Sequence, residues 1–170
     1  MKLIRWCSVL AICYCLSWTS TVYAAPGPDG FAGIPWGASK SQVDEAMRSR
    51  QFSKNEQHPN EYNGKLAGIT GGLGFIFEQD NLATGIFSFD ENSVDTIRNI
   101  IEAKYGPPTQ HDTTTMYDGW ILIWANLQAP GTSDKIRIQL KLDRVMHRAW
   151  VFYEDLGLQQ RLKAQEKNGL

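Results

Sequence analysis

The sequence predicts an α+β fold: a single antiparallel β-sheet with helices packed on one face, in the order β-α-β-β-α-β-β-β-α. Two segments carry apolar residues at helical spacing directly behind candidate N-cap serines, Ser39 and Ser93. The segments that follow each of them alternate apolar and polar residues and are separated by turn residues, which is typical of paired strands. Residues 31–170 are long enough for one domain with one core.

The first 24 residues predict a signal peptide. Lys2 and Arg5 precede an uncharged apolar stretch over residues 6–18, and a small and polar segment then ends in Val-Tyr-Ala. We therefore expect cleavage after Ala24, export, and a location in the periplasm of a bacterial envelope. No later stretch is apolar enough to predict a membrane span.

Two alternatives to a cleaved leader are weaker. An uncleaved anchor needs about 20 predominantly apolar residues, and this stretch is diluted by serines and threonines. A lipoprotein modified at Cys13 needs a small residue before the cysteine, where this chain has Ile12. All three cysteines lie in the leader, so the mature chain is expected to be cysteine-free, which fits a bacterial envelope better than a disulfide-dependent secreted domain.

Charge excludes two classes of partner. Without the leader the chain keeps 15 basic and 18 acidic residues, a balance too mild and mixed to indicate binding to nucleic acid or to a membrane surface.

The elements of the first half follow from local patterns. Residues 25–30 have the Pro/Gly composition of a linker, and 31–36 can form a short strand. Ser39 and Gln42 have capping-box spacing and start a helix that should end near Arg50. Its apolar stripe is Val43, Ala46 and Met47.

The polar segment Ser53–Lys65 has no periodicity and predicts a loop. Residues 66–78 are expected to be extended and to pair, across a turn at 79–81, with a strand over 82–90. Gly72-Leu73-Gly74-Phe75 resembles the carboxylate-binding loop of PDZ domains, but the later element of that family is absent. We therefore expect Gly68, Gly71, Gly72 and Gly74 to allow a tight turn or a bulge.

The second helix has the strongest local signals. Asn92 or Ser93 should cap it, and Gly106-Pro107-Pro108 should end it. Its buried stripe is Val94, Ile97, Ile100, Ile101 and Lys104-Tyr105.

Three strands and a terminal helix complete the domain. Residues 119–127 are apolar on both faces and predict a central strand. Residues 135–142 alternate strictly, and 145–154 should return beside them after a turn at 143–144. A short helix is expected over 156–167. The unit of a capped helix followed by strands occurs twice, either as a true α-β-β repeat or by coincidence.

The segment Gly33-Ile34-Pro35-Trp36-Gly37-Ala38-Ser39-Lys40, with Lys104-Tyr105-Gly106-Pro107 later, resembles a group of small exported bacterial proteins of unknown function. The helix-then-strands unit is distantly similar to SmpA/OmlA outer-membrane assembly lipoproteins and to the repeats of β-lactamase inhibitor proteins. Those resemblances imply a non-enzymatic binder that uses a sheet face. The chain lacks the lipobox of the former and the disulfides of the latter.

Catalytic and metal-binding patterns are weak. His58, His111 and His147 show no metal-ligand spacing, and no G-x-S-x-G elbow marks a nucleophile. The acids Asp90, Glu91 and Asp95 are explained by the dipole of the second helix. We therefore expect no enzyme activity, no metal and no cofactor.

One strand predicts a charged surface. Lys135, Arg137 and Lys141 project to the same side of the strand over 135–142, Arg148 lies on the next strand, and Arg144 lies at the turn between them. Clustered like charges indicate either an acidic partner or a solvated outer face. Aromatic residues at strand spacing belong more often to the core, but exposed they would mark a binding patch: Trp36, Trp120, Trp124, Trp150 and Phe152.

These observations favour an exported, non-enzymatic binding module that engages another envelope protein with an acidic surface, as an inhibitor, immunity factor or assembly accessory. One alternative is a carrier of a small ligand, such as a lipid or a peptidoglycan fragment, held between helices and sheet. A second alternative is a hydrolase that uses one of the histidines.

Overall fold

A computed structural model describes residues 25–114 and 118–168, and the predicted signal peptide lies outside this part of the chain. The described residues form three helices and a mostly antiparallel sheet, which confirms the α+β class. The helices are α1 (Lys40–Ser49), α2 (Val94–Tyr105), preceded by a 3-10 turn over Glu91–Ser93, and α3 (Leu156–Asn168). The strands are β1 (Ala25–Pro26), β2 (Gly30–Phe31), β3 (Ile34–Pro35), β4 (Ser53–Lys54), β5 (Glu61–Leu66), β6 (Ile69–Glu78), β7 (Asn81–Asp90), β8 (Gln110–Thr114), β9 (Gly119–Gln128), β10 (Lys135–Asp143) and β11 (Arg148–Asp155).

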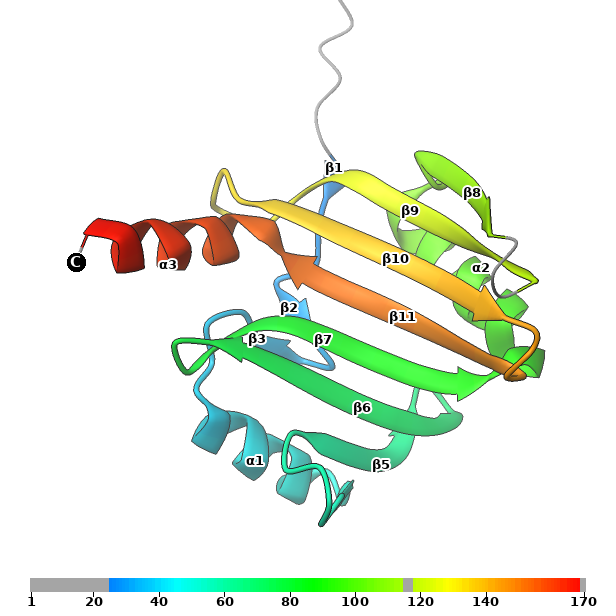
Figure 1. The fold of residues 1–170 in the computed structure, drawn as a ribbon, viewed down its shortest axis with the longest axis horizontal. Helices are drawn as coiled ribbons and strands as arrows, with labels where there is room; N and C mark the ends of the chain where they lie inside the picture. The colour runs from blue at the N-terminus through cyan, green and yellow to red at the C-terminus, as the bar shows by residue number, and fades with distance from the viewer. Residues whose placement is uncertain (1–24, 115–117, 169–170) are drawn as a thin grey trace, which may run out of the picture.

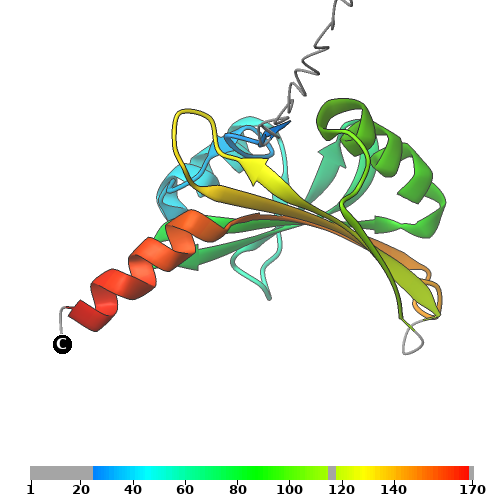
Figure 2. The same cartoon turned by 90° about the horizontal axis from the view of Figure 1, so that it is seen from above.

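The main sheet has nine strands in the order β1-β9-β10-β11-β7-β6-β5-β4, and β8 pairs with β9 on the edge that β1 also occupies. The pairing of β1 with β9 is parallel, and every other ladder is antiparallel. Helices α1 and α2 and the small β2–β3 hairpin lie on one side of the sheet, and α3 continues from β11 toward the other side (Figures 1 and 2). Two of the three helices therefore cover one face.

The sheet consists of two similar halves. Helix α1 precedes strands β4 to β7, and α2 precedes strands β8 to β11. The halves meet where β7 pairs antiparallel with β11, and Phe87 lies opposite Val151 in the middle of that ladder. Each half is thus one helix followed by a run of antiparallel strands, which is the repeated arrangement that the sequence pattern indicates.

The N-cap predicted for α1 is present in the structure, and the N-cap predicted for α2 is not. The capping box of α1 is formed: Gln42 N donates to Ser39 Oγ (3.4 Å), and Ser39 N donates to Gln42 Oε1 (2.8 Å). Ser93 makes no side-chain cap for α2. Instead Asp90 accepts from Asn92 N (3.0 Å) and caps the 3-10 turn that leads into the helix. The predicted cap is wrong because this extra turn places the first free N–H groups nearer to Asp90.

Several strand boundaries differ from expectation. The loop predicted over Ser53–Lys65 contains β4 and β5, and a strand missed by the prediction, β8, pairs with β9. The extended segment predicted over 66–78 begins with Leu66, the last residue of β5, and continues as β6 after a tight turn at Ala67–Gly68, where both residues have positive φ. The backbone of such a two-residue turn matches the twist of the two strands that it joins. In a sequence these turns are usually recognised by an Asn-Gly or Asp-Gly pair.

The N-terminal residues are also more ordered than their composition predicts. The segment 25–30 is no free linker, because β1 pairs with β9 and Gly27 N donates to Gln128 O (2.6 Å). The single strand predicted over 31–36 is the hairpin of β2 and β3. Arg50 at the end of α1 donates from Nη2 to Gly33 O (3.2 Å) and ties this hairpin to the helix.

The core lies between the sheet and the two helices. Its largest buried side chains come from both helices, α1 and α2, and from β6, β7, β9 and β10. Among them are Met47, Leu73, Phe87, Phe89, Trp124, Ile138 and Leu140. The inward-facing positions of β10 are Ile136, Ile138, Leu140 and Leu142, as the alternation predicts.

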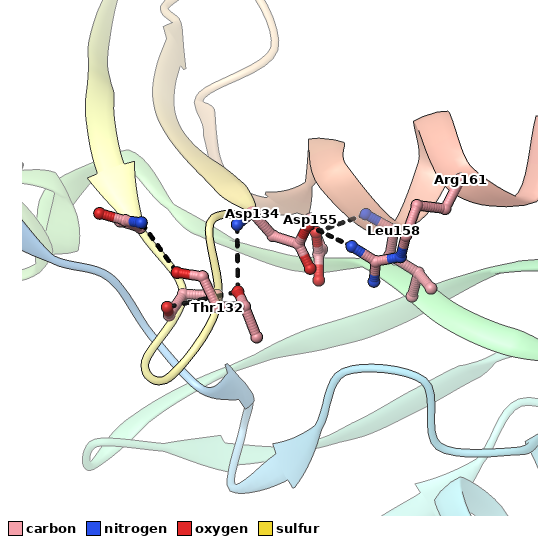
Figure 3. Close-up of polar contacts among 7 residues, drawn as sticks. Thr132, Asp134, Asp155, Leu158 and Arg161 are labelled. Atoms are coloured by element: carbon pink, nitrogen blue, oxygen red, sulfur yellow. Dashed lines mark hydrogen bonds and ion pairs between the residues drawn. The ribbon is translucent and has the colours of Figure 1, made fainter.

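Helix α3 is fixed at its first turn by carboxylates (Figure 3). Asp155, at the end of β11, is buried and accepts from Leu158 N (2.8 Å), so it caps the helix. Arg161 donates to Asp134, whose own N–H is bonded to Thr132 Oγ1 (3.1 Å). Gln159 Nε2 donates to Thr84 Oγ1 (3.1 Å) and holds the helix against β7. Burial raises the pKa of Asp155.

Candidate functional site

The face of the sheet that turns away from α1 and α2 is the candidate site, and we call it the open face. It faces the viewer in Figure 1, and the strands bend toward it at the end where β10 and β11 meet (Figure 2). The ladders place outward side chains in cross-strand rows. One row is Ile121, Lys141, Trp150, Ser88, Gly72 and Asn63. The next row is Ile123, Gln139, Phe152, Ile86, Gly74 and Glu61.

The centre of the open face is apolar. A solvated face of an antiparallel sheet is normally polar at alternate positions, but here Trp150 and Phe152 lie side by side with isoleucines, all partly exposed. Ile76, farther along β6, is 47% exposed. A contiguous exposed patch of this kind marks an interaction surface more often than isolated apolar residues do.

A groove crosses the open face above β6. It has a volume of about 390 Å³, and its floor is formed by Gly72, Gly74 and Ser88. Trp150 and Phe152 line one side, and β5 lines the other. The groove exists because the glycines have no side chains: a Cβ at Gly74 would meet only Ile86, at 3.6 Å.

The expected tight turn is present at Gly68, which lies between β5 and β6 with positive φ, but no turn or bulge occurs at Gly71, Gly72 or Gly74, which lie inside β6. The irregularity in the β6–β7 ladder lies between Ile76 and Phe77 instead. Strand alternation explains the positions: Leu73 and Phe75 point into the core, and the glycines between them face outward.

The predicted cations divide between the open face and its edge. Lys135, Arg137 and Lys141 occupy alternate positions of β10 opposite to its buried residues, and Arg148 lies on the same side of β11. Arg144 lies elsewhere, in a hollow at the β10–β11 turn that Glu91, Asp95 and His147 also line. The structure therefore brings four of the five residues onto one face.

Acidic side chains partly compensate these cations. Glu154 lies directly opposite Arg137, accepts from its Nε (2.7 Å) and Nη2 (3.1 Å), and also accepts from Gln139 Nε2 (3.2 Å). The hydrogen bond with Glu154 raises the pKa of Arg137. Asp90 lies opposite Arg148 in the β7–β11 ladder.

Lys141 and Trp150 form the link between the charged and apolar parts of the face. They are opposite each other in the β10–β11 ladder, and Lys141 Nζ lies 5.7 Å from the centroid of the indole ring. The ammonium group is therefore held over the aromatic patch.

The three histidines lie on different elements: His58 in the β4–β5 loop, His111 on β8 and His147 at the β10–β11 turn. His147 Nδ1 is 2.8 Å from Glu91 Oε1, and this hydrogen bond raises the pKa of His147. Within residues 25–114 and 118–168, no group of three His, Cys, Asp or Glu side chains is arranged to hold a metal ion.

The strand alternation predicted that the cations of β10 share one face, but it did not predict the apolar half of the site. Trp150 and Phe152 were expected in the core, whereas they lie on the open face and Trp124 is buried. The signal was present in β11, where Ala149 and Val151 alternate with Trp150 and Phe152, so that both faces of the strand are apolar.

Comparisons with family models, with curated proteins and with solved structures each give no match for this chain. No helix in the described part of the chain has both the length and the apolar character needed to cross a bilayer.

Proposed function

We propose that the protein is an exported, non-enzymatic binding module whose open face engages another protein of the bacterial envelope. The observation that carries this proposal is the groove above Gly72 and Gly74, walled by Trp150 and Phe152, in a sheet face that neither α1 nor α2 covers. The composition of the leader supports export.

The groove suits a projecting apolar side chain of the partner. Protein interfaces gain most of their affinity from a few aromatic or aliphatic anchors that enter desolvated hollows. Trp150 and Phe152 provide rigid apolar area on one side, and the floor is backbone and a serine. A phenylalanine, leucine or methionine from the partner would fill this space.

Charge supports an acidic rim on the partner. Lys135 and Lys141 project beside the apolar centre, and the Lys141 ammonium lies over the Trp150 ring. Complementary charges around an apolar centre increase the association rate and select the partner. Arg137 contributes less, because Glu154 already satisfies its guanidinium.

A site-specific photo-crosslinking experiment tests the proposal in cells that export the full-length chain. A photoreactive residue at Ile86, beside the groove, should give one dominant protein adduct. The same residue at Glu45, an exposed position of α1 on the other side of the sheet, should not give that adduct.

Two variants then connect the adduct to the groove and to the charges. Gly74→Leu fills the groove and should remove the adduct at Ile86, and Lys135→Glu with Lys141→Glu should reduce its yield. Glu45→Leu adds the same apolar bulk on α1 and is the matched control, which should leave the yield unchanged. An adduct that persists in Gly74→Leu and in the lysine variants would refute binding through the open face.

A further inference from the structure

A second hollow lies on the opposite side of the sheet, between α2 and the β2–β3 hairpin, and we call it the inner cleft. Its volume is about 350 Å³, at the lower end of the range for small-molecule sites. Phe87, Val151 and Tyr153 form its floor, α2 forms one wall, and the β2–β3 hairpin forms the other. The inner cleft is therefore separated from the open face by the sheet itself.

The two ends of the inner cleft differ in polarity. One end is apolar and is formed by Leu66 and Ala67 of the β5–β6 turn together with Ile97 from the first half of α2. Ile100, which also lines it, is 45% exposed at the surface of the helix. The other end lies at the last turn of α2, where Lys104 and Tyr105 join Tyr153.

Tyr153 provides the main polar group of the floor. Its ring packs on Phe31, with ring centroids 5.5 Å apart, and its hydroxyl makes no hydrogen bond with any residue that the structure describes. Burial raises the pKa of this hydroxyl, so it stays protonated at neutral pH and keeps a hydrogen to donate. The hydroxyl is not fully enclosed, since Asn60 Oδ1 is the one fully buried side-chain polar atom that lacks a partner among the described residues, so the hydroxyl can donate to a ligand in the cleft.

Lys104 supplies a positive charge at the same end. Its Nζ lies 5.1 Å from the centroid of the Tyr105 ring, and it forms no ion pair within the described residues. The other charged side chain that lines the inner cleft is Asp29, which is exposed and belongs to the opposite wall. An ammonium group and a phenol hydroxyl at one end thus favour a ligand group that accepts hydrogen bonds and carries negative charge.

We propose that the inner cleft binds a single-chain amphiphile, with its acyl chain along the apolar floor and its carboxylate at Lys104 and Tyr153. The apolar end, between Leu66, Ile97 and Phe87, takes the chain, and an open mouth beside Ile100 lets a longer chain continue to the surface. The site is independent of the open face, because a different set of residues lines each side of the sheet.

The chain is expressed with its leader and purified after export, and its calorimetric titration with two probes of equal chain length and opposite charge tests this site. Dodecanoate should bind, and dodecylamine should bind at least about tenfold more weakly, because its ammonium group would face Lys104. Tyr153→Phe should weaken dodecanoate about tenfold, the effect of losing a hydrogen bond to a charged group. Lys104→Gln should remove the preference for dodecanoate over dodecylamine.

Controls separate binding from folding. Tyr153→Phe breaks no described hydrogen bond, so its thermal midpoint should equal that of the wild type. Lys163→Gln removes an equal charge from the exposed side of α3 and should leave both affinities unchanged. No heat of binding with dodecanoate, or equal affinities in the wild type, Tyr153→Phe and Lys104→Gln, would overturn the proposal. Crosslinking from Ile86 reports on the open face and is unaffected by either result.

Discussion

Arg137 on β10 and Glu154 on β11 face each other on the open face, with the guanidinium bound at two points by the carboxylate. The pair is only partly buried, since the side chains are 37% and 17% exposed. This ion pair neutralises one of the cations on the open face. The charge of a sheet face therefore depends on which strands lie side by side.

A double-mutant cycle should give a modest energy for this pair. We expect Arg137→Gln and Glu154→Gln to be coupled by about 1 kcal/mol in urea unfolding, because ion pairs with exposed members are screened by solvent. A coupling energy of several kcal/mol would show instead that the pair is a main support of the β10–β11 ladder. Lys135→Gln with Glu154→Gln is the control cycle and should show additivity, because these two side chains form no ion pair or hydrogen bond in the described part of the chain.

Two glycines of β6 should respond in opposite ways to the same substitution. Gly74→Ala places a Cβ in the groove, 3.6 Å from Ile86, and should stabilise the fold by up to about 1 kcal/mol because it restricts the unfolded chain. Gly71→Ala places a Cβ 2.2 Å from Ser88 O and 2.5 Å from the Phe87 ring, and should cost about 1–3 kcal/mol. Urea midpoints measure both, and equal midpoints would contradict the outward position of Gly74.

Local patterns predicted the helices well because their signals lie within one segment. The stripe of α2 and the glycine and prolines after Tyr105 determine that helix without reference to its neighbours. Edge strands carry no such signal. On β5 the only buried residue is Tyr62, and β8 is polar throughout, so pairing with β6 and β9, not a pattern of its own, makes each of them a strand.

The candidate site shows the same limit. The alternation of β10 predicted that Lys135, Arg137 and Lys141 share a face, and they do. The groove and the compensating Glu154 depend on register between strands that are far apart in sequence, and a pattern within one strand does not contain register.

Acid should weaken the contact between α1 and β5. Tyr62 Oη donates to Asp44 Oδ1, and Lys54 Nζ lies 2.9 Å from the same carboxylate. Burial alone would raise the pKa of Asp44, but these hydrogen bonds and the charge of Lys54 outweigh it and lower the pKa. The folded state therefore binds this proton less tightly than the unfolded state does, and the stabilisation is lost as pH falls through the lowered pKa.

Asp44→Asn tests that linkage. At pH 7 the variant should be less stable by about 1.5–3 kcal/mol, the range for a hydrogen bond to a charged group. The difference from the wild type should shrink as the pH falls below 3.8, the ordinary pKa of an aspartate, and should continue to shrink with further acidification. Glu45→Gln, at an exposed position of α1, is the control and should show no such pH-dependent difference. A stability difference that does not change with pH would contradict the role of the ionised carboxylate.

The turn between β10 and β11 should carry the opposite pH dependence. The hydrogen bond between His147 Nδ1 and Glu91, with the charge of Asp90 nearby, raises the pKa of His147 above its ordinary 6.5. The folded state therefore holds this proton more tightly than the unfolded state. The stabilisation from this hydrogen bond is present below pH 6.5 and is lost as pH rises through the raised pKa.

NMR titration of the imidazole should show the raised pKa of His147 directly. Glu91→Gln should return it toward 6.5, and Glu45→Gln on α1 should leave it unchanged. A His147 pKa that does not respond to Glu91→Gln would mean that the imidazole and the carboxylate do not meet in solution.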